Sequence, residues 1–482
     1  MKIYELEPQI LWKHFYNLTQ IPRPSHHEAK AREYVTEFAK SHNLVYLVDE
    51  TGNVVIRKAA TNGLENHKTV TLQSHLDIVP QKNSHIAHNF ETDPLNVYID
   101  GDWVSAKDTT LGSDNGIGVA ASLAVLESEE LKHGPIEALF TINEEAGMEG
   151  AFGLKPGVLK GDILLNLDSE DEGELFVGCA GGINVTGTLQ MIKEEVPDDY
   201  SSLDIVVKGF KGGHSGLDIN LERGNANKVL FRLLKTLVAQ YGVRMVSVNG
   251  GSLRNAIPRE AFATILAEPG HVGDIENAVS SFEALIKNEY SATEPNIDIS
   301  VHKATEQAAY VINEMVQDDL INAVTACPTG VHHMSAEMPG TVETSNNLAI
   351  VKSDDEKIEI LNLTRSFSES RKEALVSEIE SVLSLAGCKI SKDGNYPGWN
   401  PNPESGILKT MKDVYLENWG KTPAVKAIHA GLECGIIGSK YSEMDMLSFG
   451  PTIKFPHSPD EKIMIKTVNE FWKWLVLTLE KI

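Results

Sequence analysis

The first third of the chain alternates between strand-like and helix-like apolar runs. Apolar runs at 68–79, 137–143 and 162–168 have the length and composition of buried strands. Between them, residues 115–127 are apolar almost all round, which is typical of a helix buried against a sheet. Strands that alternate with helices indicate an α/β fold, with a mixed or parallel sheet flanked by helices.

A further helix is predicted ahead of the first strand. Residues 31–39 carry apolar side chains at helical spacing, and Ser25-His26-His27-Glu28 fits a capping box at the start of that helix. In such a box the serine and the glutamate each accept a backbone N–H at the other end of the motif. The pattern therefore predicts a capping role for Ser25 and Glu28.

The character of the chain changes near Thr186. Helical runs at 226–241 and 370–386 are interleaved with antiparallel-looking strands such as 202–209 and 261–268. This mixture indicates an α+β arrangement that differs from the first third of the chain.

A second boundary is marked by the proline- and glycine-rich segment NYPGWNPNP at 395–403, after which the α/β character resumes. A chain of 482 residues is longer than one hydrophobic core usually serves, so two domains are expected. We therefore predict a discontinuous α/β domain of residues 1–186 and 396–482, interrupted by an inserted α+β domain of residues 187–395.

Composition limits the partners of the protein. The formal net charge of −25 disfavours nucleic acid and anionic membrane surfaces, because both require basic patches. The four cysteines are widely spaced without a C-x-x-C pair, so neither a disulfide framework nor a thiolate zinc site is expected. The sequence contains no run of about 18 apolar residues and no signal-peptide core. We expect a cytoplasmic protein that binds neither nucleic acid nor a membrane.

A histidine and an aspartate interrupt the first predicted strand. His75 and Asp77 lie two positions apart in TLQSHLDIVP, so strand alternation places both side chains on one face. Burying either group is costly unless it is paired. An internal salt bridge, a strand that ends in water, or a functional site would each remove that cost.

Further carboxylates and a histidine stand at comparable places. Asp114 lies where a glycine-rich loop opens the buried helix, although an aspartate there can also be a helix cap. Glu144 and Glu145 directly follow the second strand, where a solvated charged turn is the alternative. Asp168 ends the third strand, and His457 lies in a loop punctuated by prolines near the C-terminus.

Together these residues favour a metal site. Open α/β sheets bind ligands outside the carboxyl ends of their strands, which is where the predicted strands place these groups. Carboxylate oxygens mixed with imidazoles, without thiolates, suit a catalytic zinc, cobalt or manganese site. Neighbouring carboxylates such as Glu144 and Glu145 can divide the work, one binding a metal and the other carrying a proton.

The order and spacing of these residues resemble those of the M20 co-catalytic metallopeptidases. The matching series is His75-x-Asp77, Asp114 within Gly-Ser-Asp-Asn-Gly, Glu144-Glu145, Asp168 and His457. The segment KGGHSGLDI at 211–219 and the large insertion are most similar to the aminoacyl-histidine dipeptidase (peptidase D, Xaa-His dipeptidase, carnosinase-like) branch. The resemblance covers essentially the whole chain. It implies a zinc-peptidase mixed sheet flanked by helices, with the insertion as a lid and dimerisation domain.

The resemblance also implies a set of metal ligands. Two zinc ions would bind per chain, with cobalt or manganese able to substitute. Asp114 would bridge the two ions. His75 and Asp168 would complete the ligands of one ion, and Glu145 and His457 those of the other.

Two further roles follow from the resemblance. Glu144 would be the general base, and Asp77 would hydrogen-bond the far nitrogen of His75 and so fix its tautomer. The peptide bond between Asp114 and Asn115 would be cis.

Substrate-binding residues are implied in and beyond the insertion. His214 would help to stabilise the oxyanion, and it comes from the partner subunit in related dimers. Asn255 and Arg365 would bind the carboxylate end of the substrate or the intermediate, and Gly431 would line the same pocket. Two alternatives stay open: His214 as part of a solvent loop, and Arg371 in place of Arg365.

The implied function is that of a dizinc metallopeptidase. It would hydrolyse Xaa-His dipeptides, such as β-alanyl-histidine, through a metal-bridging water activated by a glutamate. The alternatives are another enzyme of the same family, a tripeptidase or a deacylase of N-acyl amino acids, and a catalytically inactive binding relative. The expected partners are a small peptide substrate and a second copy of the chain, joined through the inserted domain.

Overall fold

The computed structural model describes residues 2–482, and the chain divides into two compact units. Unit 1 comprises Met1–Cys179, Trp399–Ala427 and Leu432–Ile482. Unit 2 comprises Ala180–Gly398 and Ile428–Gly431. Unit 2 begins before residue 187 because a strand that starts at Gly181 pairs along its whole length with another strand of that unit. The return of the chain to unit 2 at 428–431 is a feature for which the sequence carried no signal.

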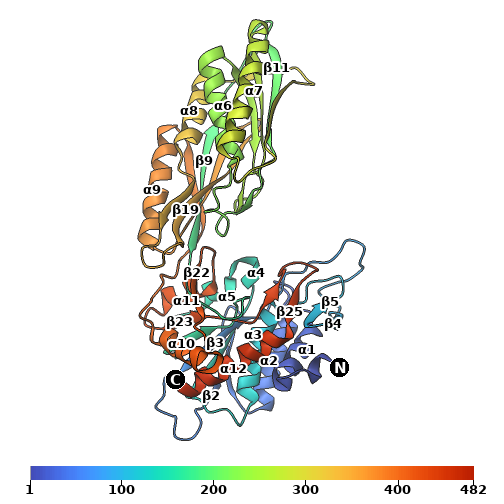
Figure 1. Ribbon diagram of the computed structural model, residues 1–482, viewed down its shortest axis with the longest axis vertical. Coiled ribbons are helices and arrows are strands. Elements are labelled where there is room, and N and C mark those ends of the chain that lie inside the picture. Colours follow the sequence, from blue (N-terminus) through green and yellow to red (C-terminus); the bar gives the residue numbers. More distant parts are fainter. Residues whose placement is uncertain (1) are drawn as a thin grey trace. The chain divides into compact units, whose positions relative to one another are not determined.

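Unit 1 is built on an eight-stranded mixed sheet (Figure 1). In spatial order its strands are β1 (Val45–Val48), β2 (Val54–Lys58), β6 (Ile136–Thr141), β3 (Val70–His75), β7 (Ile163–Asn166), β23 (Asp445–Ser448), β8 (Glu174–Cys179) and β22 (Ala424–Ile428). β3 runs parallel to both β6 and β7, and β7 runs parallel to β23. Strands β3, β6 and β7 are buried along their whole length, as expected of central strands covered on both faces.

Helices cover this sheet. They are η1 (Ile3–Glu5), α1 (Gln9–Thr19), α2 (Ala29–Ser41), α3 (Ser113–Glu127), α4 (Glu144–Gly147), α5 (Glu149–Gly153), α10 (Gly406–Trp419), α11 (Glu433–Lys440) and α12 (Ile465–Lys481). α3 packs on β3 and β6 and against α1, whereas α10 packs on β23 and against α12. A four-stranded sheet of β24 (Ile453–Lys454), β25 (Lys462–Met464), β5 (Trp103–Ala106) and β4 (Val97–Asp100) completes the unit. The α/β fold predicted from the sequence is confirmed.

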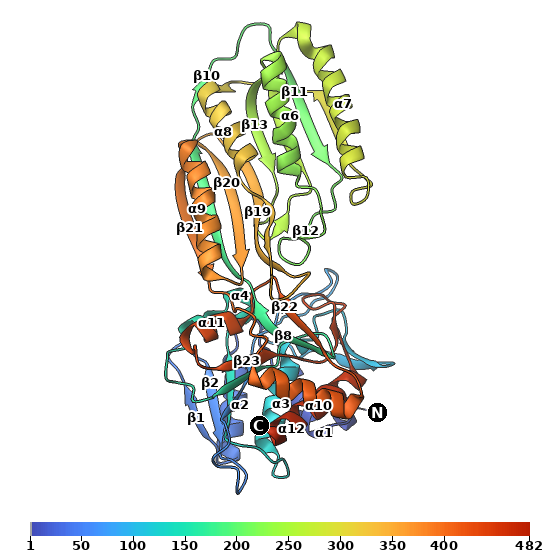
Figure 2. The same cartoon turned by 60° about the vertical axis from the view of Figure 1, so that its left-hand side comes forward.

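Unit 2 is an antiparallel sheet with helices along one face (Figure 2). In spatial order its strands are β16 (Asp298–Lys303), β11 (Ser201–Lys208), β15 (Ala261–Ala267), β13 (Arg244–Gly250), β19 (Val342–Ser353), β20 (Lys357–Ser366), β9 (Gly181–Gln190) and β21 (Lys389–Tyr396), and β18 (Gly330–Met334) also pairs with β19. The helices are η2 (Pro269–His271), α6 (Ala226–Tyr241), α7 (Val272–Glu289), α8 (Glu314–Ala326) and α9 (Glu369–Leu385). Two short pairs, β10 (Lys193–Glu194) with β17 (Val311–Ile312) and β12 (Gly213–His214) with β14 (Ala256–Ile257), lie beside them. Most of the buried apolar side chains of helices and sheet form one large core, and a small second cluster surrounds Val246, Leu266 and Val311.

The predicted capping box is wrong. α2 begins at Ala29, with Glu28 as its N-cap and without a side-chain capping hydrogen bond. Glu28 accepts hydrogen bonds from the backbone N–H groups of His26 and Asn143, and the Ser25 hydroxyl donates to Asp77. These side chains bond to the loops after β3 and β6, which local sequence cannot indicate.

Among residues 2–482, no helix has the length and apolar character needed to cross a membrane.

Candidate metal centre

The predicted site residues of unit 1 come from the ends of its central elements. His75 is the last residue of β3, Asp168 follows β7, and Glu144 and Glu145 open α4 just after β6. Since these strands are parallel, their carboxyl ends meet at one edge of the sheet. Asp114 lies at the start of α3 with non-helical backbone angles, and the peptide bond that follows it is cis.

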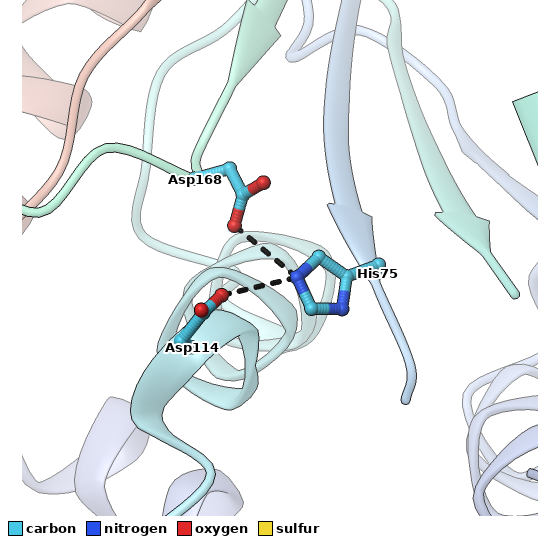
Figure 3. A group of neighbouring side chains, drawn as sticks. All are labelled: His75, Asp114 and Asp168. Carbon is cyan, nitrogen blue, oxygen red and sulfur yellow. Dashed lines mark hydrogen bonds and ion pairs between the residues drawn. The ribbon is translucent and has the colours of Figure 1, made fainter. Parts of the chain in front are cut away.

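Asp114 and Asp168 both face the imidazole of His75 (Figure 3). The Nε2 atom of His75 lies 3.1 Å from Oδ1 of Asp114 and 3.4 Å from Oδ1 of Asp168. On the other side of the ring, Nδ1 lies 3.2 Å from the carbonyl oxygen of Asp77. A proton on Nδ1 satisfies that carbonyl and leaves the Nε2 lone pair facing two carboxylates, which is the arrangement of a metal ligand.

A second group shares Asp114. The Nε2 atom of His457 lies 3.0 Å from Oδ2 of Asp114 and 3.1 Å from Oε2 of Glu145. His457 adopts a left-handed backbone conformation with φ of 57°, in the loop between β24 and β25. Asp114 is therefore positioned to contribute one oxygen to each group, as a bridging carboxylate does.

The donor set fits divalent cations. His75, Asp114 and Asp168 form one group whose ligand atoms are close enough for a shared ion, and Asp114, Glu145 and His457 form another. Oε1 of Glu145 is buried and accepts no hydrogen bond from any described residue. Two imidazoles and three carboxylates suit zinc, cobalt or manganese rather than a thiolate-type ion.

The pKa values within this cluster are strongly displaced. Burial raises the pKa of Glu145 to about 7, although a hydrogen bond with His457 opposes the shift. Hydrogen bonds to Asp114 and Glu145 raise the pKa of His457 to about 11. Burial alone would lower the pKa of His75, but Asp168 and Asp114 outweigh it and hold that pKa well above its ordinary value. The crowded carboxylates thus stabilise positive charge at both imidazoles, and bound divalent cations would supply positive charge at the same place.

Asp77 holds the turn that carries Glu144 and Glu145. Its Oδ1 accepts the backbone N–H of Glu144 at 3.0 Å, and its Oδ2 accepts that of Glu145 at 3.1 Å. Oδ2 also accepts the Ser25 hydroxyl at 2.8 Å. Oδ1 lies 3.5 Å from Nδ1 of His75, farther than the Asp77 carbonyl oxygen. Asp77 therefore supports the imidazole mainly through its backbone and the glutamate turn through its side chain.

Three charged residues near the centre carried no recognisable signal in the sequence. Arg23 and Glu461 are buried and hydrogen-bond to the loops that carry the predicted ligands. Glu433 is buried and accepts hydrogen bonds from Gln73 and Thr141. Each acts across a long separation in sequence, so no local motif marks it.

The predicted substrate residues lie in unit 2. Nδ1 of His214 accepts the backbone N–H groups of Gly216 and Leu217, which leaves the ring proton on Nε2. Burial, and then the charge of Arg365, lowers the pKa of His214 to about 4. The Asn255 side chain is exposed, and its backbone carbonyl accepts the Ser215 N–H.

Arg365 is buried on β20 beside this imidazole. Its guanidinium donates to the hydroxyls of Ser215 at 3.4 Å and Tyr396 at 2.9 Å. The Tyr396 ring lies 3.0 Å from the position that a Cβ at Gly431 would take, so Gly431 belongs to the same cluster. Arg371, by contrast, is half exposed on α9 and pairs with Glu343.

Comparison with known proteins gives a consistent result. The family model described as Peptidase family M20/M25/M40 matches residues 71–481. The cytosol non-specific dipeptidase of Escherichia coli (strain K12) is 45% identical over 481 residues, covering 100% of this chain and 99% of that protein. The crystal structure of aminoacylhistidine dipeptidase from Vibrio alginolyticus matches with a TM-score of 0.94 and 47% identity, covering 100% of this chain and 98% of that one.

A more distant structure shows the fold alone. A tripeptidase from Staphylococcus aureus matches with a TM-score of 0.56 at 16% identity, covering 99% of this chain and 98% of that one. The family match takes in every predicted metal ligand, and the two similar proteins align over nearly their full lengths. The resemblance inferred from the motifs is confirmed: the chain belongs to peptidase family M20/M25/M40 and is a hydrolase of peptide bonds.

Proposed function

We propose that this peptidase is a metal-dependent dipeptidase that hydrolyses Xaa-His dipeptides, β-alanyl-histidine among them. The observation that carries the proposal is the pair of histidine–carboxylate groups that share Asp114, with Glu144 on the adjoining turn. The names of two full-length relatives, a non-specific dipeptidase and an aminoacylhistidine dipeptidase, support the substrate class.

Two zinc ions per chain are the proposed cofactors, with cobalt or manganese as substitutes. His75, Asp114 and Asp168 would hold one ion, and Asp114, Glu145 and His457 the other. Such a pair of cations lowers the pKa of a water molecule and polarises the scissile carbonyl.

Glu144 is the proposed general base. It would accept a proton from the attacking water and pass it to the leaving amine of the dipeptide. Burial raises the pKa of Glu144 well above its ordinary value, which suits a group that must both accept and release a proton. Its backbone is fixed by Asp77, so the side chain starts from a defined position.

Residues of unit 2 are proposed to bind the substrate. His214 would donate its Nε2 proton to the developing oxyanion, in keeping with a neutral ring whose Nδ1 is already occupied. Arg365 and Asn255 would bind the free carboxylate of the dipeptide, and Gly431 would leave room for it. The buried guanidinium of Arg365 supports this role more strongly than the paired Arg371 does.

A homodimer formed through residues 187–395 and a cytoplasmic location complete the proposal. The resemblance supports the dimer, and the cytosolic name of the Escherichia coli relative supports the location. Light scattering on the purified protein tests the dimer directly.

A metal assay combined with a substrate panel tests the activity. The expected result is two tightly bound divalent ions per chain and release of histidine from dipeptides, with tripeptides and N-acyl amino acids left intact. Preferred cleavage of tripeptides or acyl amino acids would replace the proposal with one of its alternatives. Less than one bound ion per chain, with no hydrolysis, would indicate an inactive binding protein.

A further inference from the structure

Glu461 receives an unusual number of hydrogen bonds from the loop that carries Asp114. Oε2 accepts the backbone N–H groups of Leu111 at 2.8 Å and Gly112 at 3.0 Å. Oε1 accepts the N–H of Ser113 at 2.8 Å, its hydroxyl at 2.5 Å, and the N–H of Asp114 at 3.3 Å. Four consecutive backbone donors thus converge on one carboxylate, a concave arrangement of N–H groups that favours an anion.

Glu461 also belongs to the segment that carries the other histidine. It lies four positions after His457, and its own backbone N–H donates to the carbonyl oxygen of Ser458 at 3.0 Å. The side chain is only 2% exposed, so water does not weaken these contacts. One buried carboxylate therefore ties the loop of His457 to the loop of Asp114.

Arg23 forms the matching tie on the other side of the Asp114 loop. Its Nη1 donates to the carbonyl oxygens of Leu76 at 2.8 Å and Asp77 at 3.2 Å, and its Nη2 donates to that of Gly112 at 2.6 Å. A Cβ at Gly116 would lie 2.4 Å from Nη2, so the guanidinium fills the space that this glycine leaves. Arg23 is 1% exposed and joins the end of the His75 strand to the Asp114 loop.

We propose that Glu461 and Arg23 are positioning residues that lock the Asp114 loop between the segments carrying His75 and His457, and so set the affinity of the centre for divalent metal. The inference rests on the proposed metal-dependent function. Neither side chain is a ligand in this arrangement. The Glu461 oxygens accept hydrogen bonds from the Asp114 loop, and the Arg23 Nη atoms donate to backbone carbonyls. Both side chains therefore act through the placement of Asp114, the residue common to both groups.

Glu461→Gln is the informative substitution. The amide keeps one acceptor oxygen, but its NH2 group faces N–H donors, so part of the loop loses its partners and must move. We expect the dissociation constant for Mn²⁺, measured by calorimetry on metal-stripped protein, to rise about 10–100-fold. Glu461→Asp restores both acceptor oxygens on a shorter stem and should lose less affinity. Arg23→Lys should also weaken binding, because a single ammonium cannot reproduce the planar fork.

Glu137 supplies a matched control. It is likewise 2% exposed, and it accepts the backbone N–H groups of Lys160 and Gly161 near the opposite end of β6. Glu137→Gln should lower the melting temperature of the metal-stripped protein but leave the Mn²⁺ dissociation constant within about twofold of wild type. At saturating Mn²⁺, the KM of Glu461→Gln for a dipeptide should also stay near the wild-type value, since Glu461 touches no proposed substrate residue.

The outcomes separate the two proposals. Wild-type protein that binds no Mn²⁺ overturns the proposed function and the positioning role with it. Wild-type binding with equal affinities for Glu461→Gln and Glu137→Gln overturns the positioning role alone. If Glu461→Gln does not fold, the same comparison is made with Glu461→Asp and Arg23→Lys, and wild-type affinity in both has the same meaning.

Discussion

The carboxylate of Asp77 accepts the backbone N–H of Glu144 at 3.0 Å. Asp77 thus connects two segments that are close in space but distant in sequence, the end of β3 and the start of α4. Its other oxygen binds the next N–H, that of Glu145, so the two adjacent glutamates are held by one side chain. The proposed ligand Glu145 and the proposed base Glu144 therefore share a single buried support.

Replacing Asp77 tests that support. Asp77→Asn should weaken metal affinity or turnover about 10–100-fold. The two turn N–H groups bind different oxygens of Asp77, so the NH2 group of asparagine would face one of them, donor against donor. Metal titration and steady-state kinetics measure the effect. Asp49→Asn is the control, because Asp49 likewise holds a turn, in this case through the backbone N–H groups of residues 51–53. Equal metal affinity in the two variants would contradict the role given to Asp77.

Substitutions of the neighbouring residues Glu144 and Glu145 should have different effects, one on turnover and the other on metal binding. Glu144→Gln should retain metal and substrate but lose about 10²–10⁴-fold in kcat, since the amide cannot accept the water's proton. Glu145→Gln should instead lower metal occupancy, because Glu145 is the one of the pair that groups with His457. Metal analysis beside kcat measures both. Turnover of Glu144→Gln within threefold of wild type would exclude it as the base.

The clustering of the proposed ligands was predictable because it depends on local rules. His75 and Asp168 end or follow apolar strands, and parallel strands bring their carboxyl ends to one edge, so sequence pattern alone places these residues together. Glu461 is different: it bonds to Leu111, which lies 350 positions away, and only the tertiary path of the chain brings them into contact. The capping role predicted for Ser25 and Glu28 was wrong for the same reason. Their sequence fits a local capping motif, but their side chains bond to loops that are distant in sequence.

Removing metal should destabilise unit 1 as well as abolish activity. A ligand that binds only the folded state raises the free energy of unfolding by about 2.7 kcal/mol at a concentration of 100 times its dissociation constant. Without cations, carboxylates such as Glu145 remain crowded and partly unpaired. We expect chelation to lower the melting temperature and added Zn²⁺ or Mn²⁺ to restore both stability and hydrolysis. An unchanged melting curve and full activity after complete chelation would contradict the metal centre.

The imidazole of His214 should stay neutral across the physiological range. Burial and then the charge of Arg365 lower its pKa to about 4, so the ring carries only its Nε2 proton at pH 7. Because the folded-state pKa lies below the unfolded value, this group destabilises the fold as the pH falls below about 6.5. A histidine NMR titration should give a midpoint near 4, and Arg365→Ala should raise it. A midpoint near 6.5 in the wild type would contradict the environment described.

Loss of the same imidazole should affect turnover more than binding. The proposed role of His214 is to donate a hydrogen bond to the oxyanion, which exists only near the transition state. Removing one such donor typically costs about 10²–10³-fold in kcat. His214→Ala should therefore keep its metal and lose mainly kcat, as measured by steady-state kinetics and metal analysis. Full activity in this variant would confine the chemistry to residues of unit 1.

Arg365 should contribute mainly to binding of the substrate in its ground state. A guanidinium that binds the free carboxylate of the dipeptide contributes about 1.5–3 kcal/mol, so its loss raises KM roughly 10–100-fold while kcat falls less. Arg365→Lys should be nearly as impaired as Arg365→Ala, because an ammonium cannot form the bidentate fork that is already oriented by Ser215 and Tyr396. Arg371→Lys is the control, since Arg371 pairs with Glu343 instead. For a dipeptide whose C-terminal carboxylate is amidated, wild type and Arg365→Ala should have similar KM values. If Arg371→Lys raises KM and Arg365→Lys does not, the carboxylate is bound by the other arginine.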